Sequence, residues 1–81
     1  MAKLRILSQN GDTTVEWDTE RAAVGDPEAQ DAIREAERIF EEQKAKGATA
    51  FRVTPGKPAE KVERFDQTAE QIVIVPRIAG G

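Results

Sequence analysis

The last two residues of the sequence, Gly80 and Gly81, are the ones best suited to take part in a reaction. Because glycine has no Cβ, such a backbone enters a narrow channel and adopts positive φ angles without a steric penalty. The five residues from Arg77 to Gly81 span at most about 17 Å when extended. This ending is suited to carry a terminal carboxylate into the active site of another protein while the globular part stays outside. The alternative is a frayed end with no role.

The side chains that usually perform catalysis are missing from the chain. The sequence contains no cysteine and no histidine. This excludes a thiolate nucleophile, cysteine-based zinc and iron–sulfur sites, the usual general base near neutral pH and every triad that contains histidine. The acidic pairs Asp18/Glu20 and Asp26/Glu28 do not have the spacing of a Ca²⁺ loop. We therefore expect a protein that is not an enzyme by itself, with no catalytic residue, no metal and no cofactor.

Length, charge and hydropathy restrict the remaining classes. Eighty-one residues make one domain. The net charge of -3 comes from interspersed acids and bases, and only one Trp and three Phe are available for stacking on bases, so nucleic acid is not an expected partner. No stretch has the apolar length of a signal peptide or of a membrane span. These features predict a cytoplasmic protein without a membrane partner.

A β-hairpin is predicted near the N-terminus. Apolar residues alternate with polar ones on both sides of Asn10-Gly11, a dipeptide typical of two-residue hairpin turns. Such a turn pairs residues whose numbers sum to 21, so that Leu4 opposes Trp17. In this register the apolar residues share one face, and residues of opposite charge are paired on the other face.

A single long helix is predicted between Asp26 and Gly47. Asp26 followed by Pro27 is typical of an N-cap with proline at the first helical position, and Gly47 is typical of a C-terminal stop. Between them, apolar residues recur at spacings of three and four, and the other positions are mostly charged. The helix therefore has one apolar stripe that must lie on another element. Residues 19–25 before it are expected to form a loop or a short turn.

After the helix, the periodicity of apolar residues returns to two, as in β-strands. Phe51 and Val53 flank Arg52, and this alternation predicts a strand. Proline followed by glycine at residues 55–56 predicts a type II turn. Residues 59–65 are expected to form a weaker strand.

The last predicted strand, at residues 71–75, is apolar on both faces, which is typical of a central strand. A capped turn or a short helical turn is expected at residues 66–68, and Pro76 ends the strand because it has no N–H to donate. The element order is then ββαβββ. Because one helix covers only one side of a sheet, we expect an α+β domain with a mixed sheet of four to five strands and one helix packed on one face.

This element order, the central last strand and the C-terminal Gly-Gly together resemble the β-grasp, ubiquitin-like family. Within it, the Pro-X-X-Ala-Gly-Gly ending is most similar to that of the small sulfur-carrier subunit of molybdopterin synthase. The thiamine sulfur carrier and ubiquitin are more distant relatives. The topological resemblance covers the whole chain, and the resemblance in sequence is confined to residues 72–81. It implies a β-grasp domain over residues 1–76 and a flexible tail over residues 77–81.

The resemblance also implies a function. In this family a ubiquitin-activating-type (ThiF/MoeB-like) adenylating enzyme activates the C-terminal carboxylate with ATP. The activated end then becomes a thiocarboxylate that donates sulfur, or it forms an isopeptide bond to a lysine. Carried over to this chain, Gly81 is the residue of activation and attachment, with Gly80 beside it, and a sulfurtransferase or a conjugation target is a further partner. Both routes begin with the same adenylate and stay open.

Two residues of the tail are candidates for partner binding. Arg77 lies four residues before the terminal carboxylate, as an arginine does in ubiquitin. It is expected either to pair with an acidic groove of the activating enzyme or to be an ordinary solubilising charge. Ile78 gains nothing from exposure in a free tail, so it is expected to fill an apolar pocket of a partner.

A second candidate site lies on the open face of the sheet, away from the helix. Counting back from the di-glycine as in ubiquitin places Val73 and Val75 on this face. The hairpin register adds Leu7, and the alternation at residues 51–53 adds Arg52. These four residues are expected to form a small apolar patch with a basic edge, and such patches often mark partner sites.

Two other functions compete with that of a carrier. A non-conjugated ubiquitin-like binding module, or a small subunit of a multicomponent enzyme, would act through the open face, and its tail would be dispensable. A binder of small molecules is disfavoured, because no concentrated set of polar specificity groups is visible in the sequence.

Overall fold

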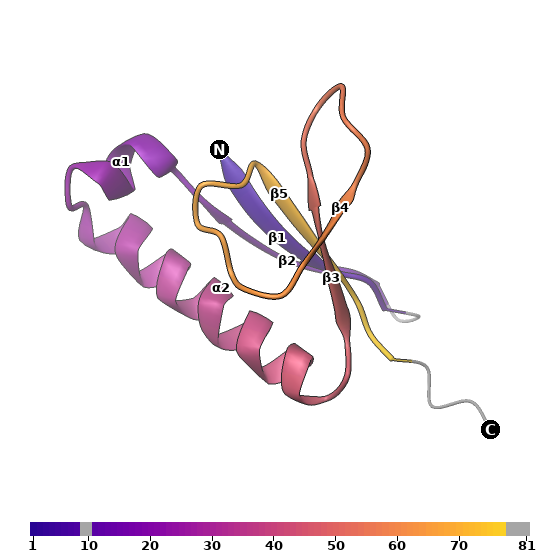
Figure 1. Ribbon diagram of the computed structural model, residues 1–81. Coiled ribbons are helices and arrows are strands. Elements are labelled where there is room, and N and C mark those ends of the chain that lie inside the picture. The colour runs from indigo at the N-terminus through magenta and orange to yellow at the C-terminus, as the bar shows by residue number, and fades with distance from the viewer. Residues whose placement is uncertain (9–10, 78–81) are drawn as a thin grey trace.

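The structure is a computed structural model that describes residues 1–8 and 11–77. Within these residues the chain forms one five-stranded sheet, one long helix and one short helix (Figure 1). The elements are β1 (Ala2–Ile6), β2 (Thr13–Trp17), α1 (Thr19–Ala23), α2 (Pro27–Ala45), β3 (Thr49–Val53), β4 (Glu60–Val62) and β5 (Gln71–Val75).

The sheet has the strand order β2-β1-β5-β3-β4. The last strand, β5, is parallel to β1 and antiparallel to β3, so the sheet is mixed. The helix α2 and the segment between β4 and β5 lie on the same side of the sheet (Figure 1). The predicted α+β class and the predicted central position of the last strand are both confirmed.

The hairpin of β1 and β2 has a different register from the predicted one. Leu4 pairs with Val15 rather than with Trp17, so that paired residue numbers sum to 19 and not to 21. The connection therefore runs over residues 7–12, and the predicted two-residue turn is wrong; Asn10 itself lies outside the described residues. Because side chains alternate with a period of two, a shift of two residues leaves each of them on its predicted face.

Charged residues explain why the shifted register is favourable. In it, Lys3 opposes Glu16, while the Nε of Arg5 donates a hydrogen bond of 2.7 Å to Asp12 in the longer connection. Asp18 is then free to act as the N-cap of α1, where it accepts hydrogen bonds from two backbone N–H groups. The segment predicted as a loop thus contains a second, short helix.

The long helix begins and ends as predicted. The Asp26 carboxylate accepts a hydrogen bond of 3.0 Å from the N–H of Ala29, and Pro27 is the first helical residue. At the other end, Gly47 has a φ of 92°. Local signals at both ends were sufficient to place this element.

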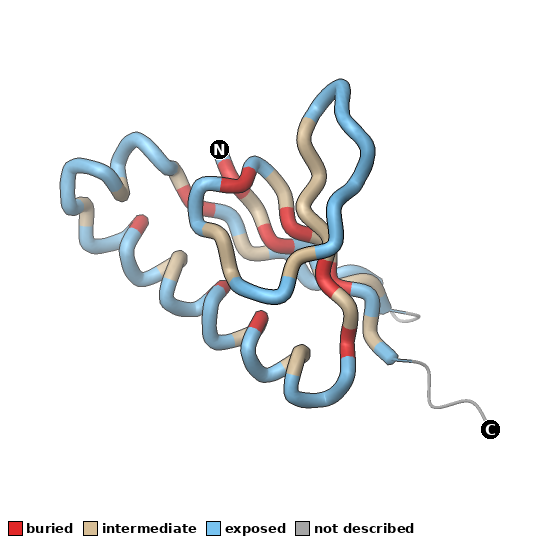
Figure 2. The backbone as a smooth tube through the Cα atoms, viewed as in Figure 1, coloured by how far each residue is buried: buried red, intermediate tan, exposed pale blue. Residues whose placement is uncertain are grey.

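The core lies between α2 and the sheet, and Figure 2 shows the buried positions of α2 on the side that faces the strands. The largest fully buried side chains are Leu4, Trp17, Phe40, Ile72 and Ile74. The ring of Phe65, from the segment after β4, lies 5.8 Å from the ring of Trp17 and 5.8 Å from that of Phe40. The Trp17 Nε1 donates a hydrogen bond of 3.1 Å to the carbonyl of Gln67, which ties the same segment to β2.

The β3–β4 hairpin contains the predicted type II turn. The N–H of Lys57 donates to the carbonyl of Thr54 at 3.1 Å, and Gly56 has a φ of 77° at the third position, as this turn type requires. The strand β4 is much shorter than predicted, because the chain turns back after it and places Phe65 against the core.

Candidate functional site

The predicted tail begins where the sheet ends. Pairing between β5 and β3 stops at Val75, directly before Pro76. Arg77 is exposed and is the last described residue. Ile78, Gly80 and Gly81 lie outside the described residues, so their predicted roles in activation and partner binding stay predictions.

The sheet face opposite to α2 carries an apolar surface that we call the open-face patch. It consists of Leu7, Phe51, Val53, Val73 and Val75. The pairing of β3 with β5 sets Val73 opposite Phe51, and the residues on either side of Val73, at 72 and 74, are buried under α2. Val75 is the most exposed member that is paired in the sheet, at 37%. The predicted orientation of Val73 and Val75 is therefore confirmed.

Leu7 joins the patch as an extension of β1. Its N–H donates to the carbonyl of Ile74 at 3.0 Å, so the pairing of β1 with β5 continues one residue past the strand. Because Ile6 packs against the core, the alternation of side chains places Leu7 on the open face. This placement agrees with the prediction, and the hairpin's shift by two residues does not alter it.

Arg52 does not lie on the open face, and its predicted place in the patch is wrong. It pairs with Ile72, which is fully buried under α2, so Arg52 points to the helix side of the sheet. There its guanidinium forms ion pairs with Glu60 at 2.7 Å and with Asp66 at 3.0 Å. Both hydrogen-bonded partners raise the pKa of Arg52 further above its ordinary value. Arg52 thus joins β3 to β4 and to the turn before β5.

Sequence reasoning missed Phe51 and Val53 because it assigned the larger apolar side chains of β3 to the core. The core positions of this segment are instead Ala48 and Ala50, which are 6% and 0% exposed. Small residues fit there because Phe40 and the other large side chains of the cluster already fill the space under α2. The available signal was the spacing of the alanines. Ala48 and Ala50 alternate with Phe51, so they lie on the same face of the sheet as Arg52.

The rim of the open-face patch carries both signs of charge. Arg5 lies beside Val73 and forms an ion pair with Asp12, and Lys61 lies beside Phe51 with its Nζ 3.9 Å from Glu63. The predicted basic edge, which depended on Arg52, is therefore replaced by cations that already have acidic neighbours.

Asp66 closes the turn before β5. Its carboxylate accepts hydrogen bonds from the Thr68 hydroxyl at 2.6 Å and the Thr68 N–H at 2.9 Å, as well as from Arg52. The Thr68 hydroxyl is the largest cause that lowers the pKa of Asp66 below its ordinary 3.8; partial burial opposes the shift, and Arg52 adds to it. The predicted capped turn is confirmed.

We expect Asp66→Asn to reduce the free energy of unfolding at neutral pH and to have less effect in acid. A carboxyl whose pKa is lowered in the folded state stabilises the fold above its unfolded pKa, and this stabilisation is lost as the pH falls through the folded-state value. Urea unfolding of both proteins between about pH 6 and about pH 3 measures the difference. A difference that does not shrink as the pH falls would contradict this role of Asp66.

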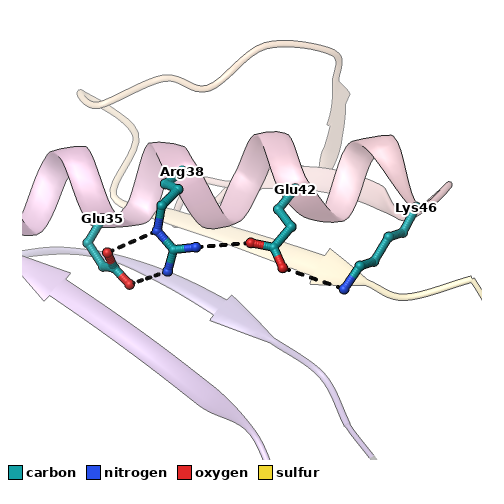
Figure 3. Close-up of polar contacts among 4 residues, drawn as sticks. All are labelled: Glu35, Arg38, Glu42 and Lys46. Carbon is teal, nitrogen blue, oxygen red and sulfur yellow. Dashed lines mark hydrogen bonds and ion pairs between the residues drawn. The ribbon is translucent and has the colours of Figure 1, made fainter.

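The exposed face of α2 is an ion-pair ladder (Figure 3). Arg38 donates to Glu35 at 2.6 Å and to Glu42 at 3.0 Å, and Glu42 also lies 3.5 Å from Lys46. Exposed pairs of this kind contribute little to stability, because water and salt screen them. Because the charges satisfy one another within the helix, this face agrees with the predicted solvated surface.

The hollows on the described surface differ in charge. One, beside β2 and the start of α2, has Glu16, Asp18, Asp26, Glu28 and Arg21 in its lining, whereas another has no charged group. The hollow between α1, α2 and the turn at residues 66–68 is lined by Thr19, Ala22, Ala23, Gln30, Ile33, Gln67 and Thr68, none of which is charged. Over residues 1–8 and 11–77, no group of three or more acidic residues is placed to hold a metal ion.

Comparison of the chain with protein-family models, with curated proteins and with solved structures finds no match. No helix in the described part of the chain has the length and apolar character needed to cross a membrane. The candidate site is therefore defined by its own geometry. It combines the end of a central strand, an apolar open face beside that strand, and a sequence that finishes on two glycines.

Proposed function

We propose that this chain is a ubiquitin-like carrier protein with a β-grasp fold, whose Gly81 carboxylate is adenylated by a ThiF/MoeB-like partner enzyme. The observation that carries the proposal is the position of the ending. The central strand β5, held by β1 on one side and β3 on the other, is followed in the sequence by Pro76, three further residues and then Gly80 and Gly81. To deliver a carboxylate into a partner's active site, a chain needs a fixed starting point, here β5, and a terminal segment without bulky side chains, here the two glycines.

The strand order and strand directions support the β-grasp assignment. In that arrangement the first and last strands are parallel neighbours at the centre of the sheet, and a helix crosses one face. The order β2-β1-β5-β3-β4 with α2 on one face has these properties. The short helix α1 is an addition between the hairpin and α2.

The proposed chemistry takes place at the terminal carboxylate. A carboxylate oxygen attacks the α-phosphate of ATP, pyrophosphate leaves, and an acyl-adenylate forms. A hydrosulfide from a sulfur donor then displaces AMP, releasing a proton and leaving a thiocarboxylate. In the other route, a lysine amine of a target displaces AMP, also releasing a proton, and an isopeptide bond forms. The chain itself contributes the carboxylate, its presentation and the docking surface.

The experiment is ATP–pyrophosphate exchange with each ThiF/MoeB-like enzyme encoded in the source genome, combined with the intact mass of the chain purified from its source. Exchange that depends on this chain is expected. A mass increase equal to the replacement of one oxygen by one sulfur indicates a sulfur carrier, and a ladder of protein adducts indicates conjugation. Absence of exchange with every such enzyme, together with an unmodified native mass, would refute the proposal.

The second candidate is a non-conjugated binding module that docks through the open-face patch. The observation that favours it is the set of apolar side chains around Val73, which no described helix covers. In a folded protein of this size, a contiguous exposed apolar surface often marks an interaction site. The two candidates differ in whether the last two residues are needed.

A further inference from the structure

The side chain of Arg77 lies across Gly47, at the end of α2. The antiparallel register of β3 and β5 pairs Thr49 with Val75, and its continuation sets residue 47 opposite residue 77. A methyl group placed on Gly47 would lie 3.1 Å from the Cδ of Arg77, 3.8 Å from its Cβ and 3.7 Å from its Nη1. Arg77 therefore packs its aliphatic stem on the bare Cα of its cross-strand neighbour, although Pro76 has already ended the hydrogen-bonded pairing.

Gly47 has a structural role at the end of α2 that does not account for this contact. Its N–H donates to the carbonyl of Lys44, and the N–H of Ala48 donates to the carbonyl of Gln43, both at 3.0 Å. These are the two hydrogen bonds of a Schellman motif, which needs a positive φ. Of the described glycines with positive φ, Gly47 alone has heavy atoms within 4 Å of such a methyl group, and the three nearest belong to Arg77.

The guanidinium of Arg77 is held without an acidic neighbour. The other cations at this end of α2 are paired, Lys44 with Glu63 at 2.8 Å and Lys46 with Glu42 at 3.5 Å. Among residues 1–8 and 11–77, no carboxylate lies within ion-pair distance of Arg77. Its stem lies against Gly47, and its charge has no acidic partner among the described residues.

We propose that Gly47 is a positioning residue for the C-terminal tail, which it orients through Arg77. With the stem of Arg77 packed on Gly47, residue 77 is held in one orientation where the tail begins, and the guanidinium is presented beside the Val75 end of the open-face patch. The inference rests on the proposed function, because the group that benefits is the activating enzyme's acidic surface. Pre-ordering a recognition side chain lowers the entropic cost of binding.

The matched pair of variants is Gly47→Ala and Gly25→Ala. Gly25 follows α1 with a φ of 83° and the same two Schellman hydrogen bonds, from Gly25 to Ala22 and from Asp26 to Arg21, but a methyl group there meets nothing within 4 Å. Both variants strain the backbone at positive φ, so each is expected to lower Tm by about 4–8 °C. Only Gly47→Ala also forces the Arg77 side chain to shift, by a few tenths of an ångström at its Cδ.

The readout that separates positioning from stability is the KM for the adenylating enzyme in ATP–pyrophosphate exchange. Gly47→Ala is expected to raise KM about tenfold with kcat unchanged, because recognition is weakened while the reacting carboxylate is the same. Gly25→Ala should keep the KM of the original chain. When Arg77→Ala is already present, adding Gly47→Ala should raise KM no further, because the side chain through which Gly47 acts is gone.

NMR of the free protein tests the same inference without an enzyme. A nuclear Overhauser effect between Gly47 Hα and Arg77 Hδ is expected, and the order of the Arg77 backbone should decrease in Gly47→Ala but not in Gly25→Ala. A missing Overhauser effect, or equal KM values for the two alanine variants, would overturn the positioning role. If no enzyme adenylates the original chain, the proposed function fails, and the NMR comparison alone decides whether Gly47 orients the start of the tail.

Discussion

Deletion of Gly80 and Gly81 is expected to abolish ATP–pyrophosphate exchange and to leave the fold unchanged. The shortened chain still has a terminal carboxylate, but this group stands about 7 Å further from the active site that it must reach and is carried by an alanine with a Cβ. The fold should persist because pairing in the sheet ends at Val75 and, of the residues that the structure describes, none after Ile74 belongs to the core cluster. Exchange assays and thermal unfolding of both chains measure the two effects.

The competing binding module predicts the opposite dependence. For that function, deletion of Gly80 and Gly81 should leave partner binding unchanged, whereas Val73→Asp should abolish it. The aspartate would put a charge on the middle strand of the open-face patch, and an apolar partner surface would have to remove water from that charge. Val73→Thr is the matched control, since it has nearly the same shape and no charge. An adenylating enzyme that activates the shortened chain as fast as the full chain would exclude the carrier function.

Phe40→Ala is expected to remove about 3–5 kcal/mol of stability, which is the second large effect. An 81-residue domain has a total free energy of unfolding of about 4–12 kcal/mol, so this variant should lose a large part of its stability, and nearly all of it at the low end of that range. Phe40 is 0% exposed and packs edge-on against Phe65. The cavity would stay open, because the strand beneath it contributes only the short side chains of Ala48 and Ala50 to the cluster.

Urea unfolding followed by tryptophan fluorescence measures this loss, since Trp17 belongs to the same aromatic cluster. Val24→Ala is the control, because Val24 is 84% exposed and its truncation should change the free energy of unfolding by less than about 0.5 kcal/mol. A loss below about 1 kcal/mol for Phe40→Ala would contradict the packing of α2 on the sheet.

The elements that could be predicted are those whose signals lie within a few residues of one another. The N-cap at Asp26, the proline after it and the glycine at position 47 define both ends of α2. The turn at residues 55–56 and the central strand β5 were predicted for the same reason, since turn chemistry and two-sided apolar character are local properties.

The open-face patch was predicted only in part, because the sequence of a strand with apolar residues on both faces does not indicate which face packs against the core. In β3, Phe51 and Ala50 are both apolar, and the choice between them depends on the volume left by α2. Arg52 was misplaced with them, because the ion pairs with Glu60 and Asp66 that hold it on the helix side join residues 8 and 14 positions apart, which only the fold of the β3–β4 hairpin and the turn before β5 brings together.

The amino-acid sequence by itself determined the α+β class, the ends of α2, the central last strand and the Gly-Gly ending, because each depends on residue types and short-range spacing. Only the tertiary structure decided the hairpin register, the facing of β3 and the contact of Arg77 with Gly47. These three depend on which volumes and charges meet across strands. The packing of the whole core determines which side chains meet when they are distant along the chain. A local sequence pattern therefore does not predict such contacts.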